Sequence, residues 1–205
     1  MLDSTLALIA LALALALRPW RLFAGRPALV TPLLATLAIL PWLWALPALL
    51  KLSPQLQWSG AVLVLLMLGW PIAVPVLLLV ALLACLISPL SAQDALAAGV
   101  WQGIVPATLA LFAGAAVRRW LPSHAFVYIL GRGFASALLC LFAARLLAQH
   151  LGAAPAAGVG GMGLVVAQWL MAWGDAFVTG MLTAIFVAFK PEWLLTWSDA
   201  HYLRR

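Results

Sequence analysis

The feature that most constrains this chain is a succession of long apolar runs, each separated from the next by a few polar or charged residues. Residues 28–50, for example, contain no charged side chain, and a bilayer core of about 30 Å requires about 20 such residues per helix. Hydrophobic residues make up 67% of the sequence and charged residues 8%, and the mean hydropathy of +1.15 is far above that of a soluble domain. Because the runs lack the alternation of barrel strands, we expect an all-α integral membrane protein, built as a polytopic helical bundle.

The runs predict about seven transmembrane helices in a single transmembrane domain that covers residues 1–205. The third run is too long for one straight span and contains "GWP" at residues 69–71, where we place a tight turn between two helices. If that break is only a kink, the count is six. The predicted runs are residues 5–17, 28–50, 58–87 (divided at 69–71), 97–117, 124–148 and 163–188.

Positive charges gather at alternate ends of the runs, as topology signals do. This pattern predicts an N-terminus outside and a C-terminus in the cytoplasm, and it leaves the outer loops with little beyond Lys51 and Arg145. The formal net charge of +6 therefore reflects membrane topology, and its distribution does not indicate nucleic-acid binding. The predicted inner charges are Arg18, Arg21, Arg26, Arg118, Arg119, Lys190, Arg204 and Arg205.

Polar side chains recur along the sixth predicted helix. His124, Tyr128, Arg132, Ser136 and Cys140 follow one another at a spacing of four, which places neighbours on one face of a helix. We therefore expect His124, Tyr128 and Arg132 to line a polar interior.

A second polar stripe lies on the seventh predicted helix, where Asp175 and Thr179 interrupt an apolar run. A charge in the bilayer costs from about 3 to roughly 10 kcal/mol or more and needs a partner. Since the sixth and seventh helices are antiparallel neighbours, we predict that Arg132 and Asp175 form an ion pair or a one-water bridge. The alternative is that the pair only holds the two helices together.

Catalytic motifs are missing from the sequence. It contains no GxSxG, no HExxH and no neighbouring pair of carboxylates, and its three histidines are far apart. We therefore expect no enzymatic activity and no covalently bound cofactor.

Three stretches in the second half of the chain resemble one bacterial membrane family. They are "LPSHAFVYILGRGFASALL" at 121–139, "GDAFVTGMLTAIFVAFKPEW" at 174–193 and "DAHYL" at 199–203. The chain is similar there to energy-coupling factor (ECF) transporter permeases related to CbiM, the substrate-specific component of cobalt and nickel uptake systems. The resemblance implies a seven-helix subunit of the bacterial inner membrane that captures a transition metal ion outside. A coupling transmembrane protein and ABC ATPases would then drive the ion inward.

The resemblance also implies how a metal would be held, and this chain departs from that pattern. Cobalt and nickel members begin Met-His, whereas this chain begins Met-Leu-Asp, and it has Gln55 and Gln57 where relatives look rich in histidine. Family members carry Glu at the position of Asp175. The candidate metal ligands that remain are Asp175 and His150, the latter predicted near the outer face.

The tail carries a third pattern, because Trp193, Trp197 and His201 recur at a spacing of four. This spacing predicts one face of a short helix. Such a face indicates an interfacial membrane anchor, or a docking site in which Trp193 and Trp197 contact the coupling protein.

The sequence therefore predicts the substrate-binding or permease component of an ECF-type uptake system. Two alternatives remain open. One is a proton-coupled carrier of small solutes, in which Asp175 gains and loses a proton and flux requires no ATPase. The other is a non-transporting scaffold or assembly factor, in which Asp175→Asn lowers the protein level and changes no flux.

Overall fold

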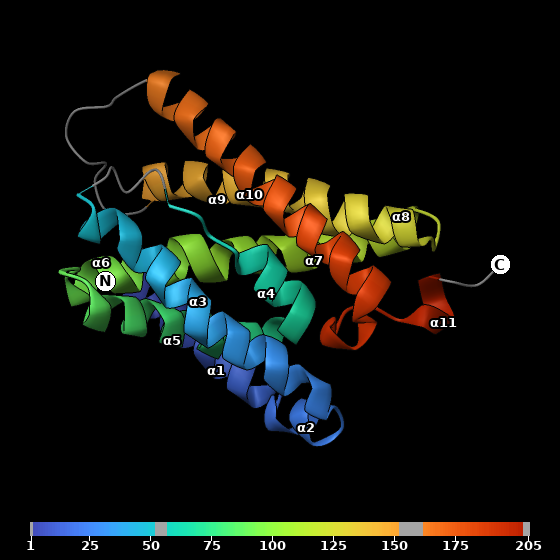
Figure 1. Cartoon of the computed structure of the whole chain (residues 1–205). Helices are drawn as coiled ribbons and strands as arrows, with labels where there is room; N and C mark the ends of the chain where they lie inside the picture. The colour runs from blue at the N-terminus through green and yellow to red at the C-terminus, as the bar shows by residue number, and fades with distance from the viewer. Residues whose placement is uncertain (1, 52–56, 152–161, 203–205) are drawn as a thin grey trace.

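The computed structural model describes residues 2–51, 57–151 and 162–202, and every regular element in those ranges is a helix (Figure 1). The chain is an all-α polytopic membrane protein, as its apolar runs predict. The longer elements are α1 (Leu2–Ala16), α3 (Val30–Leu49), α4 (Ala61–Leu68), α5 (Trp70–Ile87), α6 (Ala92–Ala98), α7 (Val105–Trp120), α9 (Ser136–Leu151) and α10 (Met162–Phe189).

Five helical stretches are long and apolar enough to cross a membrane. Each of the seven predicted runs contains a helix, but two of these helices are shorter than the five stretches: α1 has 15 residues and α4 has eight. At 1.5 Å per residue, α4 is about 12 Å long, far less than a hydrocarbon core of about 30 Å, so it is not a span of its own. The five stretches are Pro27–Leu49, Trp70–Ile87, Ala92–Trp120, Ala125–Leu151 and Met162–Phe189.

Two glycines in the left-handed region mark the ends of α4. Gly60 before the helix has φ 64° and Gly69 after it has φ 73°, values that glycine adopts without steric cost. Pro71 follows in the first turn of α5, where its missing N–H leaves no hydrogen bond unmade. The "GWP" sequence is therefore a break between two helices, as predicted, and not a kink within one.

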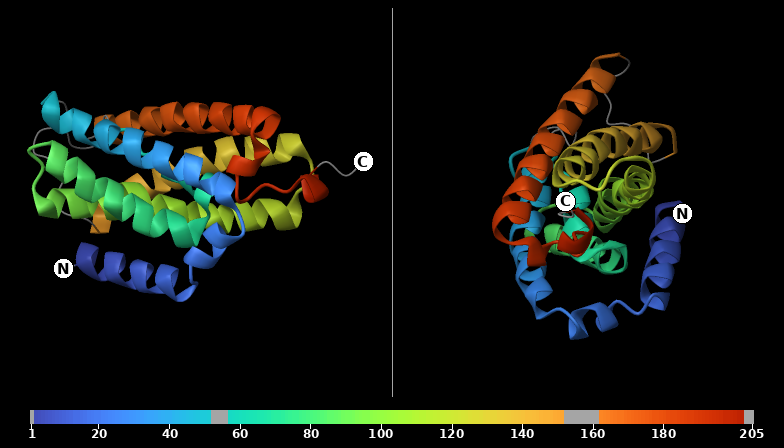
Figure 2. Two further views of the ribbon diagram at one scale, coloured as in Figure 1. Left: turned by 60° about the horizontal axis from the view of Figure 1, so that its bottom comes forward. Right: turned by 90° about the vertical axis from the view of Figure 1, so that its right-hand side faces the viewer.

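The half-helix α4 lies in the middle of the bundle, surrounded by the longer helices (Figures 1 and 2). All eight of its residues are buried, and it packs against α3, α5, α7 and α10. Because α4 is buried away from water, the N–H groups at its start and the carbonyl groups at its end need hydrogen-bond partners within the protein.

Those predicted inner charges that the structure describes lie at one end of the bundle, whose two ends are seen in Figure 2. The end where α1 and α10 begin is here called the N-terminal end, and the opposite end, with the segment that follows α10, is called the tail end. Of the predicted inner charges, those on α2 (Trp20–Ala24), its flanking residues, α7 and the end of α10 all lie at the tail end. Arg204 and Arg205 are outside the described residues.

Two of the spans contain π-helical turns, η3 (Gly99–Ile104) and η4 (Tyr128–Ala135). A π turn holds one more residue than an α turn. In η4 this is visible in the hydroxyl of Ser136, which donates to the carbonyl five residues earlier at 2.8 Å. The extra residue rotates the helix, so a spacing of four no longer keeps successive side chains in line. Such turns often occur at functional sites.

Candidate functional site

The Asp175 side chain is completely buried, midway along α10. Its carboxylate accepts two backbone hydrogen bonds, from the Ser59 N–H at 2.9 Å and from the Gly60 N–H at 3.2 Å. Both N–H groups lie immediately before Ala61, the first residue of α4, where the start of the helix carries partial positive charge. The Ala61 N–H itself donates to the Ser59 hydroxyl at 3.2 Å. The start of the half-helix therefore stabilises a carboxylate inside the apolar interior.

Arg145, on α9, supplies the ion-pair partner of Asp175. Its Nη2 lies 3.8 Å from Asp175 Oδ2 and donates to the Gln57 carbonyl at 2.8 Å. The Arg145 side chain is only 13% exposed, because α9 continues to Leu151 and keeps residue 145 inside the bundle. The predicted pair of Asp175 with Arg132 is therefore wrong, and so is the assignment of Arg145 to an outer loop.

Gln57, Ser59 and Gln102 extend this contact into a network. Gln102, in η3, donates through Nε2 to Gln57 Oε1 at 2.7 Å, and Gln57 Nε2 donates to the Trp44 carbonyl at 2.9 Å. The Ser59 hydroxyl donates to the Gln102 carbonyl at 2.5 Å, while Trp44 Nε1 donates to the Ser59 carbonyl at 3.1 Å. We call Asp175, Arg145, Gln57, Ser59 and Gln102 the polar centre.

Two buried atoms of the polar centre have no hydrogen-bond partner among the described residues: Arg145 Nη1, a donor, and Gln102 Oε1, an acceptor. Both side chains contact Gln57, so the two unpaired groups flank one residue. Gln168 Oε1, two turns before Asp175 on α10, is unpaired as well. An unpaired buried polar group costs about 1–3 kcal/mol. A few such groups converging in an apolar surrounding are typical of sites that bind a small polar solute.

Arg132 belongs to a second polar cluster, at the tail end. Its Nη1 donates to the Thr196 carbonyl at 3.4 Å and to the Tyr202 hydroxyl at 3.3 Å. The guanidinium carbon stands 5.5 Å from the centre of the Tyr128 ring, and the Tyr128 and Thr196 hydroxyl oxygens are 2.7 Å apart. Arg132 and Tyr128 are therefore partners of the tail and not of Asp175.

The segment that follows α10 caps the last turn of α4. The Leu195 N–H donates to the Met67 carbonyl at 3.0 Å, and the Thr196 N–H donates to the Leu66 carbonyl at 3.3 Å. The Thr196 hydroxyl donates to the same Leu66 carbonyl at 2.9 Å. The last carbonyls of a helix have no partner within it, so these bonds satisfy the end of α4 as Asp175 satisfies its start.

Trp197 is part of this second cluster, where its ring stacks on that of Tyr202 with centroids 4.9 Å apart. Only 6% of Trp197 is exposed. The tail forms a short 3-10 helix, η5 (Pro191–Trp193), and a separate helical turn, α11 (Asp199–Tyr202). A single helix with both tryptophans on one face is therefore a wrong prediction. Docking of a partner at the half-buried Trp193 stays a prediction.

Three further predicted residues lie in different surroundings. His124 is exposed and its Nδ1 accepts the N–H two residues ahead at 3.2 Å, capping the short α8 (Ala125–Val127), so its placement in the polar interior is wrong. Thr179 is completely buried one turn after Asp175. His150 is exposed near the end of α9.

Metal ligands are sparse around this site. The described ranges contain no group of three or more His, Cys, Asp or Glu side chains that could hold a metal ion. Asp175 and His150, the two predicted candidates, differ in surroundings, since one is buried and the other exposed. Gln57 takes part in the polar centre, whereas Gln55 and Met1 lie outside the described residues.

Sequence reasoning missed three members of the polar centre, Arg145, Ser59 and Gln102. A signal existed for Arg145, because it falls within the predicted run 124–148. Ser59 contributes a backbone N–H to Asp175, which no side-chain pattern reveals.

Comparison with known proteins does not identify a function, so a proposal has to rest on the geometry of the polar centre. No protein-family model, no curated protein and no solved structure matches the chain.

Proposed function

We propose that this protein is the substrate-binding or permease component of an ECF-type uptake system for a small solute, with a transition metal ion as the first candidate. The observation that carries the proposal is the buried half-helix α4, because the two N–H groups just before it bond to Asp175 midway along a spanning helix. Transporters commonly use helices that break near the bilayer midplane, because the broken ends offer unpaired backbone groups to ions and substrates.

The charges of the polar centre support solute binding over a purely structural role. Burying a carboxylate and a guanidinium within the membrane is costly, and well-packed apolar side chains would hold two helices together at least as well. The unpaired Arg145 Nη1 and Gln102 Oε1 add a donor and an acceptor that helix packing alone does not require.

For a metal ion, the polar centre would supply oxygen ligands. Gln102 Oε1 has no partner in the described part of the chain, whereas the Asp175 carboxylate and Gln57 Oε1 would have to exchange their present donors for the ion. Oxygen ligands suit harder ions such as manganese, whereas cobalt and nickel sites draw more on imidazole. The resemblance to CbiM-related permeases favours cobalt or nickel, so a test has to cover both groups of metals.

The proposal includes an orientation and partners. With positive charges at the tail end, the positive-inside rule puts that end in the cytoplasm of a bacterium and the N-terminus outside. The solute would enter from the N-terminal end and leave with the help of a coupling transmembrane protein and ABC ATPases.

The test is elemental analysis of the detergent-purified protein after exposure to Mn, Fe, Co, Ni, Cu and Zn in turn. We expect stoichiometric retention of one metal, its loss in Asp175→Asn, and its retention in Glu192→Gln, which neutralises an exposed tail acid. Gel filtration and circular dichroism verify that both variants are folded. If neither the wild-type protein nor Asp175→Asn retains a metal, the metal candidate is wrong, the resemblance concerns the fold alone, and the buried charges are structural until another solute is found to bind.

Flux measurements separate the two alternatives. In proteoliposomes that contain this chain alone, uptake driven by a pH gradient would identify a proton-coupled carrier, in which the buried Asp175 is the group that titrates. In cells, an Asp175→Asn variant that lowers protein level and changes no flux would identify a scaffold.

A further inference from the structure

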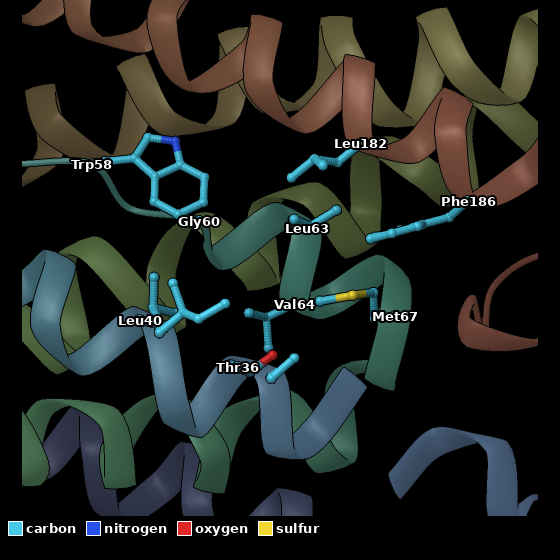
Figure 3. A pocket seen from close by; sticks show the side chains of 11 residues that line it. Thr36, Leu40, Trp58, Gly60, Leu63, Val64, Met67, Leu182 and Phe186 are labelled. Carbon is cyan, nitrogen blue, oxygen red and sulfur yellow. The ribbon is translucent and has the colours of Figure 1, made fainter. Parts of the chain in front are cut away.

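An apolar groove lies between α3 and α10 and reaches the buried half-helix α4. Its volume is about 230 Å³. Figure 3 shows the side chains that surround it, which come from all three helices. Ala35 and Ile39 line the groove and are also exposed on the outer surface of α3. The groove therefore opens on the side of the molecule that faces the membrane interior.

The half-helix offers the groove one continuous face. Gly60, Leu63, Val64 and Met67 stand at intervals of three and four residues, which align on one side of a helix, and all four line the groove. Leu40, Leu182 and Phe186 complete the wall opposite. In a membrane, such a surface is matched by hydrocarbon.

The side chains that line the groove offer few hydrogen-bonding groups to a polar ligand. Its one hydroxyl, on Thr36, already donates to the Pro32 carbonyl in its own helix at 2.8 Å. The indole N–H of Trp58 is the one side-chain donor of the lining without a partner among the described residues, so a polar solute that entered would lose most of its hydration for at most one hydrogen bond, at a cost of several kcal/mol. Hydrocarbon has no hydration to lose on entry and gains dispersion contacts with the surrounding side chains.

The walls of the groove are almost wholly apolar, and they come from α3, α4, α10 and the segment just before α4. Acyl chains are the apolar groups that surround a membrane protein at this depth, so the groove opens directly onto them. We propose that the groove between α3 and α10 binds the acyl chain of a membrane lipid. This inference concerns a different site from the polar centre and does not depend on the proposed transport function.

A bound acyl chain would lie next to the polar centre. Gly60 lines the groove, and its N–H is one of the two that hold Asp175. Trp58, one residue before Ser59 of the polar centre, also lines the groove. An acyl chain in place would cover the start of α4 from the lipid side and seal the polar centre laterally.

The test uses the full chain in lipid nanodiscs that contain a phospholipid with a photoactivatable diazirine in its acyl chain. After illumination, labelled residues are mapped by peptide mass spectrometry. We expect label on Leu63 and Met67 of α4, which are only 6% exposed each and lie beyond the reach of lipids around the outer surface. Label on Leu34, which is 60% exposed on α3, reports ordinary surrounding lipid.

A pair of alanines on α3 supplies matched variants. Ala35 and Ala38 are both exposed, but only Ala35 lines the groove. Ala35→Phe is expected to fill the groove and abolish label on α4 while leaving label on Leu34. Ala38→Phe is expected to leave both unchanged.

Three results would overturn the proposal. The first is label on Leu34 without label on α4. The second is α4 label that survives in Ala35→Phe. The third is a photocrosslinker at Ala35 that, in native membranes, couples to a second protein and to no lipid, which would make the groove a protein interface.

Discussion

Asp175 and Gly60 are 115 residues apart in the sequence, and the carboxylate of one accepts the backbone N–H of the other at 3.2 Å. The bond joins a spanning helix, α10, to the start of the half-helix α4. The acid holds the two residues that lead into α4, Ser59 and Gly60, by their backbone N–H groups. It resembles a capping side chain in placing a carboxylate at the positive end of a helix.

The first prediction concerns this cap. Asp175→Asn keeps an acceptor oxygen but loses the charge, and should lower the free energy of unfolding by about 1–3 kcal/mol. Asp175→Leu leaves Arg145 without its counter-charge and two N–H groups without an acceptor, and should cost about 3–5 kcal/mol. Unfolding in mixed micelles titrated with SDS measures both. Glu192→Gln, at an exposed site, should cost under about 1 kcal/mol; an equal loss in all three variants would contradict the capping role.

The second prediction identifies the partner of Asp175. In a double-mutant cycle, Asp175→Asn and Arg145→Gln should show a coupling energy of about 0.5–3 kcal/mol, as expected for groups in contact. The parallel cycle of Asp175→Asn with Arg132→Gln should be additive within about 0.5 kcal/mol, because Arg132 bonds to Thr196 and Tyr202. The same SDS titration measures both cycles, and the reverse order of couplings would refute the assignment of Arg145.

The third prediction concerns the break after α4. Gly69 has φ 73°, and a Cβ there would lie 2.5 Å from Leu195 Cδ2. Gly69→Ala should therefore destabilise the protein by about 1–3 kcal/mol through backbone strain alone. In the Gly69→Ala background, Leu195→Ala should remove the contact with the added Cβ, but the loss of stability from backbone strain should remain. Gly174→Ala is the control, because nothing lies within 4 Å of its added Cβ; in a helix it should stabilise by about 0.5–1 kcal/mol. A neutral Gly69→Ala would mean that α4 and α5 can join as one helix.

The fourth prediction concerns the tail. The Leu195 and Thr196 amides lie outside any helix, yet they donate to carbonyls of α4, so hydrogen exchange should find them protected. Thr196→Val removes the hydroxyl that bonds to Leu66 and Tyr128, and should speed exchange at both amides. It should also cost about 1–3 kcal/mol. Ser198→Ala, at an exposed neighbouring position, serves as the control. Fast exchange in the wild-type protein would show that the tail does not hold α4.

Much of the fold follows from local residue patterns, whose effect does not depend on how the helices pack. The apolar runs predict helices because backbone groups in lipid must bond within their own segment. The "GWP" sequence predicts a break because glycine permits the left-handed conformation and proline starts the next helix. That Asp175 would have a polar partner also follows, since an isolated charge in a membrane is too costly.

The choice of partner could not be predicted in the same way. Spacing on adjacent helices pointed to Arg132, but the π turns of η4 change the helical register, and the tail occupies the Arg132 side chain. The charge pattern assigns Arg145 to an outer loop, although the residue lies within the predicted run 124–148, so the prediction leaves it out as a partner of Asp175. Gln57 and Gln102 belong to segments whose proximity only the packed bundle reveals.

The sequence by itself determined that this chain is a helical membrane protein, where most of its helices run, and that Asp175 could not remain unpaired. Only the tertiary structure decided that α4 is a buried half-helix, that the N–H groups just before it and Arg145 stabilise Asp175, and that the tail caps its other end. The physical reason is that helix periodicity and hydropathy are local, whereas the partners here are largely backbone groups. Every residue carries those groups, and their availability depends on where a helix ends in space.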